Sequence, residues 1–484
     1  MGDLGEYRRR RDPRRTPEPV PEEPVRPGRD ELFVIQEHHA RRLHWDVRLE
    51  RGGVLVSWAV PKGLPPDQES VRLAVRTEDH PLEYADFEGE IPAGEYGAGR
   101  MIIWDRGRYE TVKWSRDEVS VVLRGERVRG RYVFFRRSRG GGGERDEWLV
   151  RRSDPPQEPG WEPLPSSLAP MLATAGVLPP AEQDPQWAYE FKWDGVRALV
   201  RVEGGRVTIT SRLGNDVTRS YPELRALGES LGSTQVLLDG EIVAFEGGRP
   251  SFAALQRRMH VGGEAQARRL AGARPVTYLV FDLLHLDGRS CLELPYERRR
   301  HLLEGMALSG PRWQTPPSFP GAGSAVLRAS REQGLEGVVA KRLASRYQPG
   351  RRSPDWIKVA HVRAQEVVIG GWRPGQGRRA DTVGALVCGI PEEGGLRFVG
   401  LVGTGFTDAA LDHLRGLLAR RARKTSPFVT PLPADLRRQA RWVSPTLVGE
   451  VVFREWTRDG RMRAPSWRGL RPDRSPREVV LDEV

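Results

Sequence analysis

The chain of 484 residues is poor in cysteine and has no long apolar run. Its two cysteines, Cys291 and Cys388, exclude a disulfide scaffold and a cysteine-rich zinc site, and they fit a reducing cytosol. No stretch of about 18 apolar residues occurs, so the sequence predicts no membrane span. The N-terminal residues have no apolar segment and predict no secretory signal. We therefore expect a cytoplasmic protein of roughly three domains, at about 100–200 residues per domain.

Lysine is scarce as well. Six lysines occur, at positions 62, 113, 192, 341, 358 and 424, and the other basic residues are arginines. An arginine stays protonated, whereas a lysine amine can lose its proton and attack an electrophile, so the remaining lysines are candidates for chemistry. The net charge of +12 favours a nucleic-acid partner, because phosphate contacts release bound counterions. The same charge also fits any protein from an arginine-rich proteome.

Changes in composition along the chain predict a multidomain α+β protein. Residues 1–29 are rich in Arg, Pro and Glu and predict a disordered basic tail. Short strands between Gly and Pro predict a small β-barrel over 30–152, and the proline-rich residues 153–170 predict a linker. Mixed strands and helices predict an α+β domain over 171–362, and short Gly-rich strands predict an OB-type barrel over 363–484. The helical stretches expected in the last two domains are 222–230, 297–306 and 408–422.

The strongest local signal surrounds Lys192, in Glu190-Phe191-Lys192-Trp193-Asp194-Gly195. The pattern predicts a strand that ends at a tight turn, where a lysine is held rigidly. Burial and cationic neighbours can lower a lysine pKa from about 10.4 toward neutrality, and the free amine can then attack phosphorus. Taken alone, the motif also fits a hairpin with a solvated lysine.

Further motifs follow Lys192 in a fixed order. With it they resemble the motif series of the covalent nucleotidyltransferases, specifically the ATP-dependent DNA ligases. The motifs are Ser211-Arg212-Leu213-Gly214, Leu238-Asp239-Gly240-Glu241, Leu279-Val280-Phe281-Asp282, Glu336-Gly337-Val338-Val339-Ala340-Lys341, Trp356-Ile357-Lys358 and Arg471-Pro472-Asp473-Arg474.

This resemblance implies that Lys192 attacks the α-phosphate of ATP and forms lysyl-AMP. The AMP then moves to the 5′-phosphate of a nick, and the 3′-hydroxyl displaces it as the strand is sealed. The family's last motif lies on the OB domain, which swings about a hinge near residues 360–365. The implied nucleotide contacts are Glu190 at the adenine amine, Phe281 on the base, Arg197 and Arg212 at sugar and phosphates, Glu241 and Glu336 as ligands of Mg²⁺ or Mn²⁺, and Lys341, Lys358 and Arg471 at the phosphates.

Two positions depart from the ligase pattern. Ligases usually carry a second lysine two residues after the one at 358, where this chain has Ala360, and Arg363 is the candidate substitute. The last motif ends in Arg474 rather than lysine, which keeps the charge. Because Lys-x-Asp-Gly is shared, a capping-type guanylyltransferase and an RNA ligase remain alternatives. A non-enzymatic scaffold bound to Ku is a third, for which Ala360 is the hint.

Four of the nine histidines lie between residues 38 and 80. His44, Asp46 and Arg48 alternate, so on a strand they share one face, and His38 has the same parity. Two imidazoles and a carboxylate suit Mn²⁺ or Zn²⁺, and an arginine beside them can grip a phosphate. His80 is a second phosphate ligand or an acid. The pattern equally fits a polar strand face on a basic protein.

The sequence around these histidines resembles the 3′-phosphoesterase domain of bacterial ligase D. The resemblance implies that His38, His44 and Asp46 bind the metal, that Arg48 and His80 contact phosphate, and that the domain removes a 3′-phosphate or a 3′-terminal ribonucleotide. Tyr84 and Lys62 are further candidate contacts. The motifs that carry the resemblance are Ser57-Trp58-Ala59-Val60-Pro61-Lys62-Gly63, Asp86-Phe87-Glu88-Gly89, Gly94-Glu95-Tyr96-Gly97 and Trp104-Asp105.

Together the two series resemble ligase D of bacterial non-homologous end joining. The resemblance implies ATP as cofactor, double-stranded DNA with nicks or ends as substrate, and Ku as partner, in a nucleoid-associated protein. The family often has a primase-like polymerase domain as well. We expect no room for one in this chain, so gap filling is expected from a separate primase-polymerase.

Overall fold

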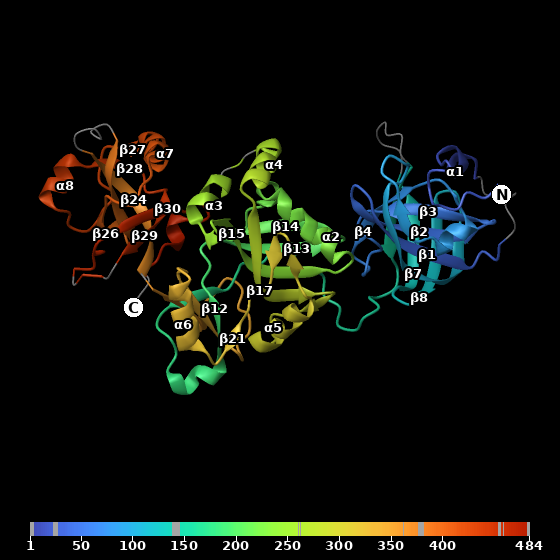
Figure 1. Ribbon diagram of the computed structural model, residues 1–484, viewed down its shortest axis with the longest axis horizontal. Coiled ribbons are helices and arrows are strands. Elements are labelled where there is room, and N and C mark those ends of the chain that lie inside the picture. Colours follow the sequence, from blue (N-terminus) through green and yellow to red (C-terminus); the bar gives the residue numbers. More distant parts are fainter. Residues whose placement is uncertain are drawn as a thin grey trace.

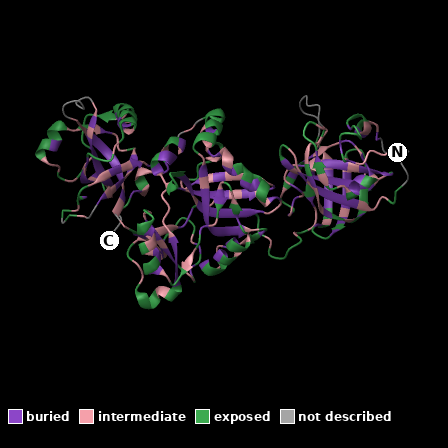
Figure 2. Cartoon of the chain, viewed as in Figure 1, coloured by how far each residue is buried: buried purple, intermediate pink, exposed green. Residues whose placement is uncertain are grey.

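The structure is a computed structural model. Three domains follow one another along its length, from the N-terminal barrel through the central domain to the C-terminal domain (Figure 1). Buried residues concentrate on the strands of all three domains, whereas most helices are exposed on their outer sides (Figure 2). None of the helices that the structure describes has the length and apolarity needed to cross a membrane. The described residues are 4–22, 28–137, 146–259, 261, 263–361, 363–375, 382–453, 456–457 and 459–481.

Eight antiparallel strands close the N-terminal domain into a barrel. Neighbouring strands pair in the order β1-β2-β3-β4-β10-β9-β8-β7, and β7 pairs again with β1, which closes the ring. The predicted small β-barrel is therefore confirmed. The strands of the ring are β1 (Leu32–His39), β2 (Leu43–Arg51), β3 (Val54–Val60), β4 (Val71–Arg76), β7 (Gly99–Trp114), β8 (Glu118–Gly125), β9 (Arg129–Arg136) and β10 (Glu147–Arg152), with short β5 (His80–Pro81), η1 (Leu82–Asp86) and β6 (Gly89–Ile91) beside them.

The barrel has an apolar interior because apolar residues alternate along its strands. On β2 the side chains of Trp45, Val47 and Leu49 belong to the interior cluster. The residues between them point to the outer face, since successive side chains of a strand point to opposite sides. Alternation on one strand thus fills the core and presents a polar row outside.

The predicted disorder of residues 1–29 is wrong for residues 4–22. This segment contains α1 (Gly5–Arg9) and packs on the outer face of the barrel, where Tyr7 is fully buried. Arg11 forms ion pairs with Glu18 at 2.8 Å and with Glu78 at 2.9 Å. Arg11 is thus neutralised by one carboxylate of its own segment and one of the barrel domain, and the buried Tyr7 anchors the segment.

The predicted linker, residues 153–170, is attached at both ends. Asp154 and Gln157 accept hydrogen bonds from backbone amides of β9, at 2.7 and 2.8 Å. Beyond them, the amide of Glu162 donates to the carbonyl of Gly288 in the central domain at 2.7 Å, and Leu164 is buried there. Glu158 also pairs with Arg289 of the central domain at 3.7 Å, so the segment passes from one set of contacts to the other directly after Gln157.

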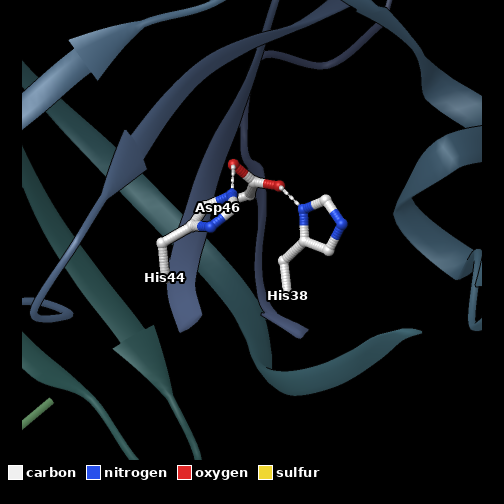
Figure 3. Close-up of side chains that lie close together, drawn as sticks. All are labelled: His38, His44 and Asp46. Carbon is white, nitrogen blue, oxygen red and sulfur yellow. Dashed lines mark ion pairs between the residues drawn. The ribbon is translucent and has the colours of Figure 1, made fainter. Parts of the chain in front are cut away.

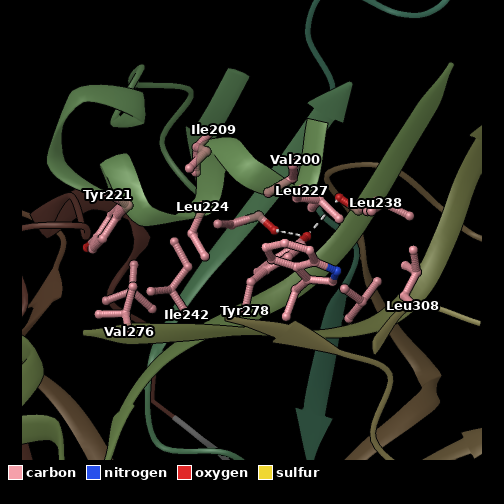
Figure 4. Close-up of a cluster of buried hydrophobic side chains, with 14 of the residues drawn as sticks. Val200, Ile209, Tyr221, Leu224, Leu227, Leu238, Ile242, Val276, Tyr278 and Leu308 are labelled. Carbon is pink, nitrogen blue, oxygen red and sulfur yellow. Dashed lines mark hydrogen bonds between the residues drawn. The ribbon is translucent and has the colours of Figure 1, made fainter. Parts of the chain in front are cut away.

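The central domain consists of two sheets with helices on their outer sides. Its buried centre includes Tyr278, whose hydroxyl donates to the carbonyls of Ala198 and Leu238 at 3.1 Å (Figure 4). One sheet has the order β11-β23-β22-β12-β21 and the other β14-β13-β15-β17-β20-β19. The strands are β11 (Leu172–Ala175), β12 (Trp187–Phe191), β13 (Val196–Glu203), β14 (Arg206–Ser211), β15 (Val236–Glu246), β16 (Arg249–Pro250), β17 (Val276–Leu286), β18 (Arg289–Ser290), β19 (Ser309–Gly310), β20 (Trp313–Gln314), β21 (Phe319–Pro320), β22 (Gly337–Arg342) and β23 (Arg352–Ala360).

Both helical stretches that the sequence predicts for this domain are helical in the structure. The stretch 222–230 forms η4 and then α2, and the stretch 297–306 forms α5. A second apolar cluster, which includes Phe281 of β17 and Trp356 of β23, joins the two sheets. The sheets therefore meet at the residues that the motif series singled out. The helices are η2 (Ala181–Gln186), η3 (Thr218–Ser220), η4 (Pro222–Arg225), α2 (Ala226–Leu231), α3 (Phe252–Met259), α4 (Glu264–Ala273), α5 (Tyr296–Gly305) and α6 (Gly323–Glu332).

The C-terminal domain has the OB-type fold that the sequence predicts. Strand β24 pairs with β25 and β29, which pair in turn with β26 and β30. The predicted helix over 408–422 is α7, capped by the Thr407 hydroxyl, which accepts from the amide of Ala410 at 3.2 Å. The elements are β24 (Arg363–Pro374), β25 (Val383–Glu392), β26 (Gly395–Val402), α7 (Asp408–Ala419), β27 (Ala422–Arg423), α8 (Ala434–Gln439), β28 (Arg441–Val443), β29 (Val448–Phe453), β30 (Ser466–Leu470) and η6 (Pro476–Glu478).

Candidate active sites

Lys192 lies directly after β12, where the first sheet opens toward the second. Its backbone amide donates to the carbonyl of Gly337 at 2.9 Å, which fixes it beside the start of β22. The preceding residue, Glu336, forms an ion pair with the Lys192 ammonium group. Strand pairing therefore brings together a lysine and a carboxylate that are 144 residues apart in sequence.

A cavity of about 560 Å³ separates the two sheets beneath the C-terminal domain. Every ligase residue that the sequence analysis singled out lines this one cavity. They are Glu190, Lys192, Arg197, Arg212, Glu241, Phe281, Glu336, Lys341, Lys358 and Arg471.

One end of the cavity is a buried polar network around Glu190. Lys341 forms an ion pair with this carboxylate at 2.9 Å, and the hydroxyl of Tyr296 donates to it. Burial lowers the pKa of Lys341 despite the opposing effect of Glu190. The ammonium group also lies 4.4 Å from the ring centre of Phe281. Lys341, expected at the phosphates, therefore contacts both residues expected at the base.

Arg197 is held rigidly against the same aromatic ring. Its guanidinium forms two hydrogen bonds to Asp239, at 2.5 and 2.6 Å, and lies 4.6 Å from the ring centre of Phe281. Burial disfavours its charge, but the Asp239 carboxylate outweighs burial and raises the Arg197 pKa. The hydroxyl of Tyr347 donates to Asp239 at 2.6 Å. Asp239 and Tyr347 thus position Arg197. The sequence analysis had named Arg197 as a site residue but not these two partners.

Glu241 and Glu336, the two carboxylates that the sequence analysis expected to bind the metal, line the same cavity. Burial raises the pKa of Glu241 to about 7. The acidic group that the described residues do form contains Asp194, Glu336 and Glu450, with one oxygen from each within 4.8 Å of the others. A divalent ion held by Glu336 would accordingly also lie within reach of Asp194 and Glu450.

That acidic group is occupied by Arg468, a residue that the sequence analysis missed. Arg468 lies on β30 and reaches across the domain boundary, pairing with Asp194 at 2.5 Å and with Glu336. On the same domain Arg471 pairs with Asp473 and Glu450, each at 2.8 Å. The C-terminal domain is therefore closed on the Lys192 cavity. The sequence held one indication that Arg468 belongs to the site, because it lies three residues before Arg471 of the last ligase motif.

The phosphate-binding candidates at the other end include two arginines. Burial lowers the pKa of Arg212, although Glu366 opposes that shift. Arg363 lines the same cavity as Ala360 and Lys358. An arginine is thus available where the ligase pattern has its second lysine.

The three metal candidates of the barrel lie together on its outer face (Figure 3). Strand pairing sets His38 directly opposite His44. The nitrogens that face Asp46 are Nδ1 of His38 at 3.6 Å and Nε2 of His44 at 3.7 Å. The other nitrogens are fixed by carbonyls, of Gly97 at 2.8 Å and of Arg42 at 2.9 Å. Such carbonyl contacts orient imidazoles that bind metals, so the donor set fits a transition-metal ion.

Arg48 is buried next to this group. It donates to Gln36 at 2.6 Å, to Ser57 at 3.1 Å and to Asp46 at 2.9 Å. Burial alone would raise the pKa of Asp46, but Arg48 and His44 hold it well below its usual range. Asp46 is therefore ionised, as a metal ligand must be.

His80 lies beside Arg48 in the same pocket. Burial lowers its pKa well below the usual range, and the charges of Arg48 and Arg11 add to the effect. Its Nδ1 contacts the carbonyl of Glu78 at 2.9 Å, whereas Nε2 lies 3.4 Å from a guanidinium nitrogen of Arg11. His80 is therefore neutral in this arrangement.

Arg11 is a site residue that the sequence analysis missed. It lines a second cavity, of about 1160 Å³, together with His38, His44, Asp46, Arg48 and His80. Strand parity could not reveal it, because it arrives from the N-terminal segment. Its composition was instead interpreted as a disordered tail.

Family models match each domain. Residues 36–136 match the DNA ligase D 3′-phosphoesterase domain, residues 170–360 the ATP dependent DNA ligase domain, and residues 379–474 the ATP dependent DNA ligase C terminal region. The domain matches thus define the class of protein, a barrel of the ligase D 3′-phosphoesterase family followed by two ATP-dependent DNA ligase domains. Its three domains belong to these DNA ligase and ligase D families.

Two LigD proteins align with 99% of this chain. The chain is 49% identical to the multifunctional non-homologous end joining DNA repair protein LigD of Mycobacterium tuberculosis strain H37Rv, over 99% of this chain and 61% of that protein. It is 37% identical to LigD of Pseudomonas aeruginosa PAO1, over the same shares. A solved mycobacterial DNA ligase D with ATP and MES is 46% identical, covering 65% of this chain and 98% of its own, with a TM-score of 0.49. The resemblance to bacterial ligase D is confirmed, and the chain spans about three fifths of these LigD proteins.

Proposed function

We propose that this chain repairs DNA ends in two steps, first restoring a 3′-hydroxyl and then sealing the strand. The observation that carries the sealing step is that Lys192 and nine predicted nucleotide contacts line a single cavity. Five predicted phosphoesterase residues likewise share the barrel cavity. The products of the first centre are what the second requires.

In the sealing centre the first step is attack by the Lys192 amine on the α-phosphate of ATP. A phosphorus–nitrogen bond forms, the bond to the bridging oxygen breaks, and pyrophosphate leaves. The amine must first lose a proton, and the Glu336 carboxylate is the acceptor in contact with it. Arg468 and Arg471 bring fixed positive charge from the C-terminal domain to the leaving phosphates.

The later steps require the C-terminal domain to move. Strand β30 covers the Lys192 cavity through Arg468, so a DNA nick reaches lysyl-AMP only after that contact opens. The hinge expected near residues 360–365 contains residue 362, which lies outside the described residues. The nick's 5′-phosphate then takes the AMP, and its 3′-hydroxyl displaces AMP to form the phosphodiester.

In the barrel centre, His38, His44 and Asp46 would hold a Mn²⁺ or Zn²⁺ ion. When bound, such an ion supplies positive charge to the phosphate and lowers the pKa of water. Arg48 is fixed by three hydrogen bonds, so it orients a phosphate at little entropic cost. His80, whose Nε2 faces Arg11 at 3.4 Å, is proposed as the second phosphate contact beside Arg48.

The remaining assignments follow from the relatives. The LigD proteins are named for non-homologous end joining, which supports double-stranded breaks as substrate and Ku as partner. We propose ATP with Mg²⁺ or Mn²⁺ for sealing, a separate primase-polymerase for gaps, and a place on the nucleoid. The buried carboxylate of Glu190 can accept from the adenine N6 amine, and a comparison of sealing with ATP and with GTP distinguishes a ligase from a capping enzyme.

The test is a nicked duplex with a 3′-phosphate, incubated with ATP and Mn²⁺ and resolved on a denaturing gel. We expect sealed product from the wild type, a 3′-hydroxyl without sealing from Lys192→Ala, and an intact 3′-phosphate from His44→Ala. A nick that already has a 3′-hydroxyl should be sealed by His44→Ala. If the wild type fails to seal a nick that already has a 3′-hydroxyl, the ligase assignment is wrong and a scaffold role is favoured, whereas sealing by Lys192→Ala at the wild-type rate would remove Lys192 as the nucleophile.

A further inference from the structure

One hairpin turn of the central domain reaches the barrel. Strands β13 and β14 are joined by Gly204 and Gly205, whose φ angles are +55° and +67°. A Cβ on Gly204 would lie 2.6 Å from Cα of Lys62, and one on Gly205 would lie 2.4 Å from a methyl carbon of Leu43. Distances this short mean that the two domains touch through bare backbone, which glycine alone permits.

The residue before this turn, Glu203, forms ion pairs with the barrel. Glu203 pairs with Arg72 of the barrel at 3.0 Å and with Lys62 at 3.3 Å. Arg72 is 7% exposed, and it also donates to the carbonyls of Gly63 and Leu64 at 3.3 and 3.0 Å. A buried arginine needs a carboxylate, and here the carboxylate comes from the neighbouring domain.

A second contact joins the same two domains through other elements. The indole nitrogen of Trp104, on β7, donates to the hydroxyl of Ser233 at 3.0 Å, just after α2. Gly232 lies beside Glu37 of β1, because a Cβ there would be 3.1 Å from its carboxylate. Two separate contacts, together with a connecting segment that is bound to both domains, restrict both separation and rotation of the domains.

We infer that the Glu203 turn is a docking element that holds the phosphoesterase barrel on the central domain in solution. The two catalytic centres then form one rigid unit, and the C-terminal domain is the part that moves. Docking occupies Lys62, a candidate phosphate contact, so the barrel would receive DNA with this lysine already paired. The inference goes beyond the proposed function, because it concerns how the domains are held.

The chain contains a matched control for this turn. The sequence Glu203-Gly204-Gly205-Arg206 recurs as Glu246-Gly247-Gly248-Arg249 between β15 and β16. There the φ angles are +58° and +78°, and among the described residues a Cβ would meet nothing within 4 Å. The two turns share sequence and backbone form but differ in what they touch.

The first test compares Gly204→Ala with Gly247→Ala. Both place an alanine at the same φ, so both carry the same local strain, but only Gly204→Ala drives a methyl group into the backbone of Lys62. Small-angle X-ray scattering should show a larger maximum dimension for Gly204→Ala alone. Hydrogen exchange of the peptide over residues 60–65 should rise about tenfold in that variant alone. Identical scattering and exchange in the two folded variants would overturn the inference.

A second pair keeps the inference testable if Gly204→Ala does not fold. Glu203→Lys sets a lysine against Lys62 and Arg72, whereas Glu246→Lys makes the same charge change at an exposed site. We expect undocking in Glu203→Lys, partly reversed by adding Lys62→Glu. Docking that survives Glu203→Lys unchanged would remove the role given to this carboxylate. Both readouts measure domain docking, so their results do not depend on the activity of either centre.

Discussion

The two candidate centres are built in opposite ways. In the barrel, the ligand candidates His38, His44 and Asp46 come from two adjacent strands, and pairing alone sets them face to face. In the ligase centre, Lys192 and Glu336 lie 144 residues apart, and Arg468 arrives from another domain. The metal-ligand candidates of the first centre all lie on the strands of one barrel. The second is complete only while two domains are closed.

This contrast predicts how each centre fails. A preformed site should lose all of its activity when one ligand is lost, whatever the step. A site assembled by domain closure should lose only the steps that need closure. Substitutions at the two centres therefore distinguish a rigid site from an assembled one.

The largest effect is expected for Asp46→Asn in the barrel. The change removes the carboxylate that both imidazoles face and leaves Arg48 buried with one charge partner fewer. Release of 3′-phosphate should fall about 1,000-fold, or about 4 kcal/mol in activation free energy. Sealing of a nick with a 3′-hydroxyl should stay at the wild-type rate.

The control for this variant is Asp117→Asn, which makes the same chemical change at an exposed position of the barrel. Chelation of divalent ions should reproduce Asp46→Asn for phosphate release. Phosphate release that survives both chelation and Asp46→Asn would contradict the metal assignment of this cluster.

Arg468→Ala tests the assembled centre and should have a smaller, selective effect. Because Arg468 contacts Glu336 and Asp194 in the closed form, lysyl-AMP formation should fall about 100-fold, the scale of one lost preorganised donor. Sealing of a nick that is already adenylated should change by less than about threefold, because that step uses the open form.

The two steps are measured with labelled ATP and with a pre-adenylated nick, respectively. Arg477→Ala, an exposed arginine of η6, is the matched control. Equal losses in both steps would mean that Arg468 serves the chemistry throughout rather than domain closure.

These predictions also show what sequence can and cannot supply. Alternation on β2 was enough to group His44, Asp46 and Arg48, because parity is a property of one strand. The ligase motifs identified residues that line the cavity, but they did not show which of these residues contact one another. Lys341, which was expected at the phosphates, pairs with Glu190, and Glu336 groups with Asp194 and Glu450. Such pairs depend on which strands and domains meet.

Contacts that come from outside an element were missed for the same reason. Arg11 reaches the barrel site from the N-terminal segment, whose charges indicated disorder. The turn after Glu203 contacts another domain, whereas its twin after Glu246 does not. Since the two turns have the same sequence, the difference lies wholly in the tertiary structure.

The next smaller effect concerns the pH dependence of stability through Glu241. Burial raises its pKa to about 7, above the value of about 4.5 in an unfolded chain. A raised pKa means that its stabilising contribution is full below pH 4.5 and is lost as pH rises through 7. Glu241→Gln should therefore stabilise the free protein by about 2 kcal/mol at pH 8 and by little at pH 5.

Thermal unfolding at the two pH values checks this expectation. Glu246→Gln, an exposed carboxyl on the same strand, should show no such difference. Equal shifts at pH 5 and pH 8 would mean that Glu241 is ionised throughout.

The smallest effect concerns Ala360, where ligases usually have a second lysine. It tests whether the ligase centre tolerates the loss of a single cation. Arg363 and Ala360 line the same cavity, so an arginine three residues later can supply the charge that ligases usually take from lysine. Arg363→Ala should slow overall sealing about tenfold, and adding Ala360→Lys should restore most of it. Ala360→Lys alone should change the rate by less than about threefold, because a second cation adds little to a charge already supplied. If Arg363→Ala has no effect, the remaining cations suffice and this centre is less sensitive to single losses than the barrel centre.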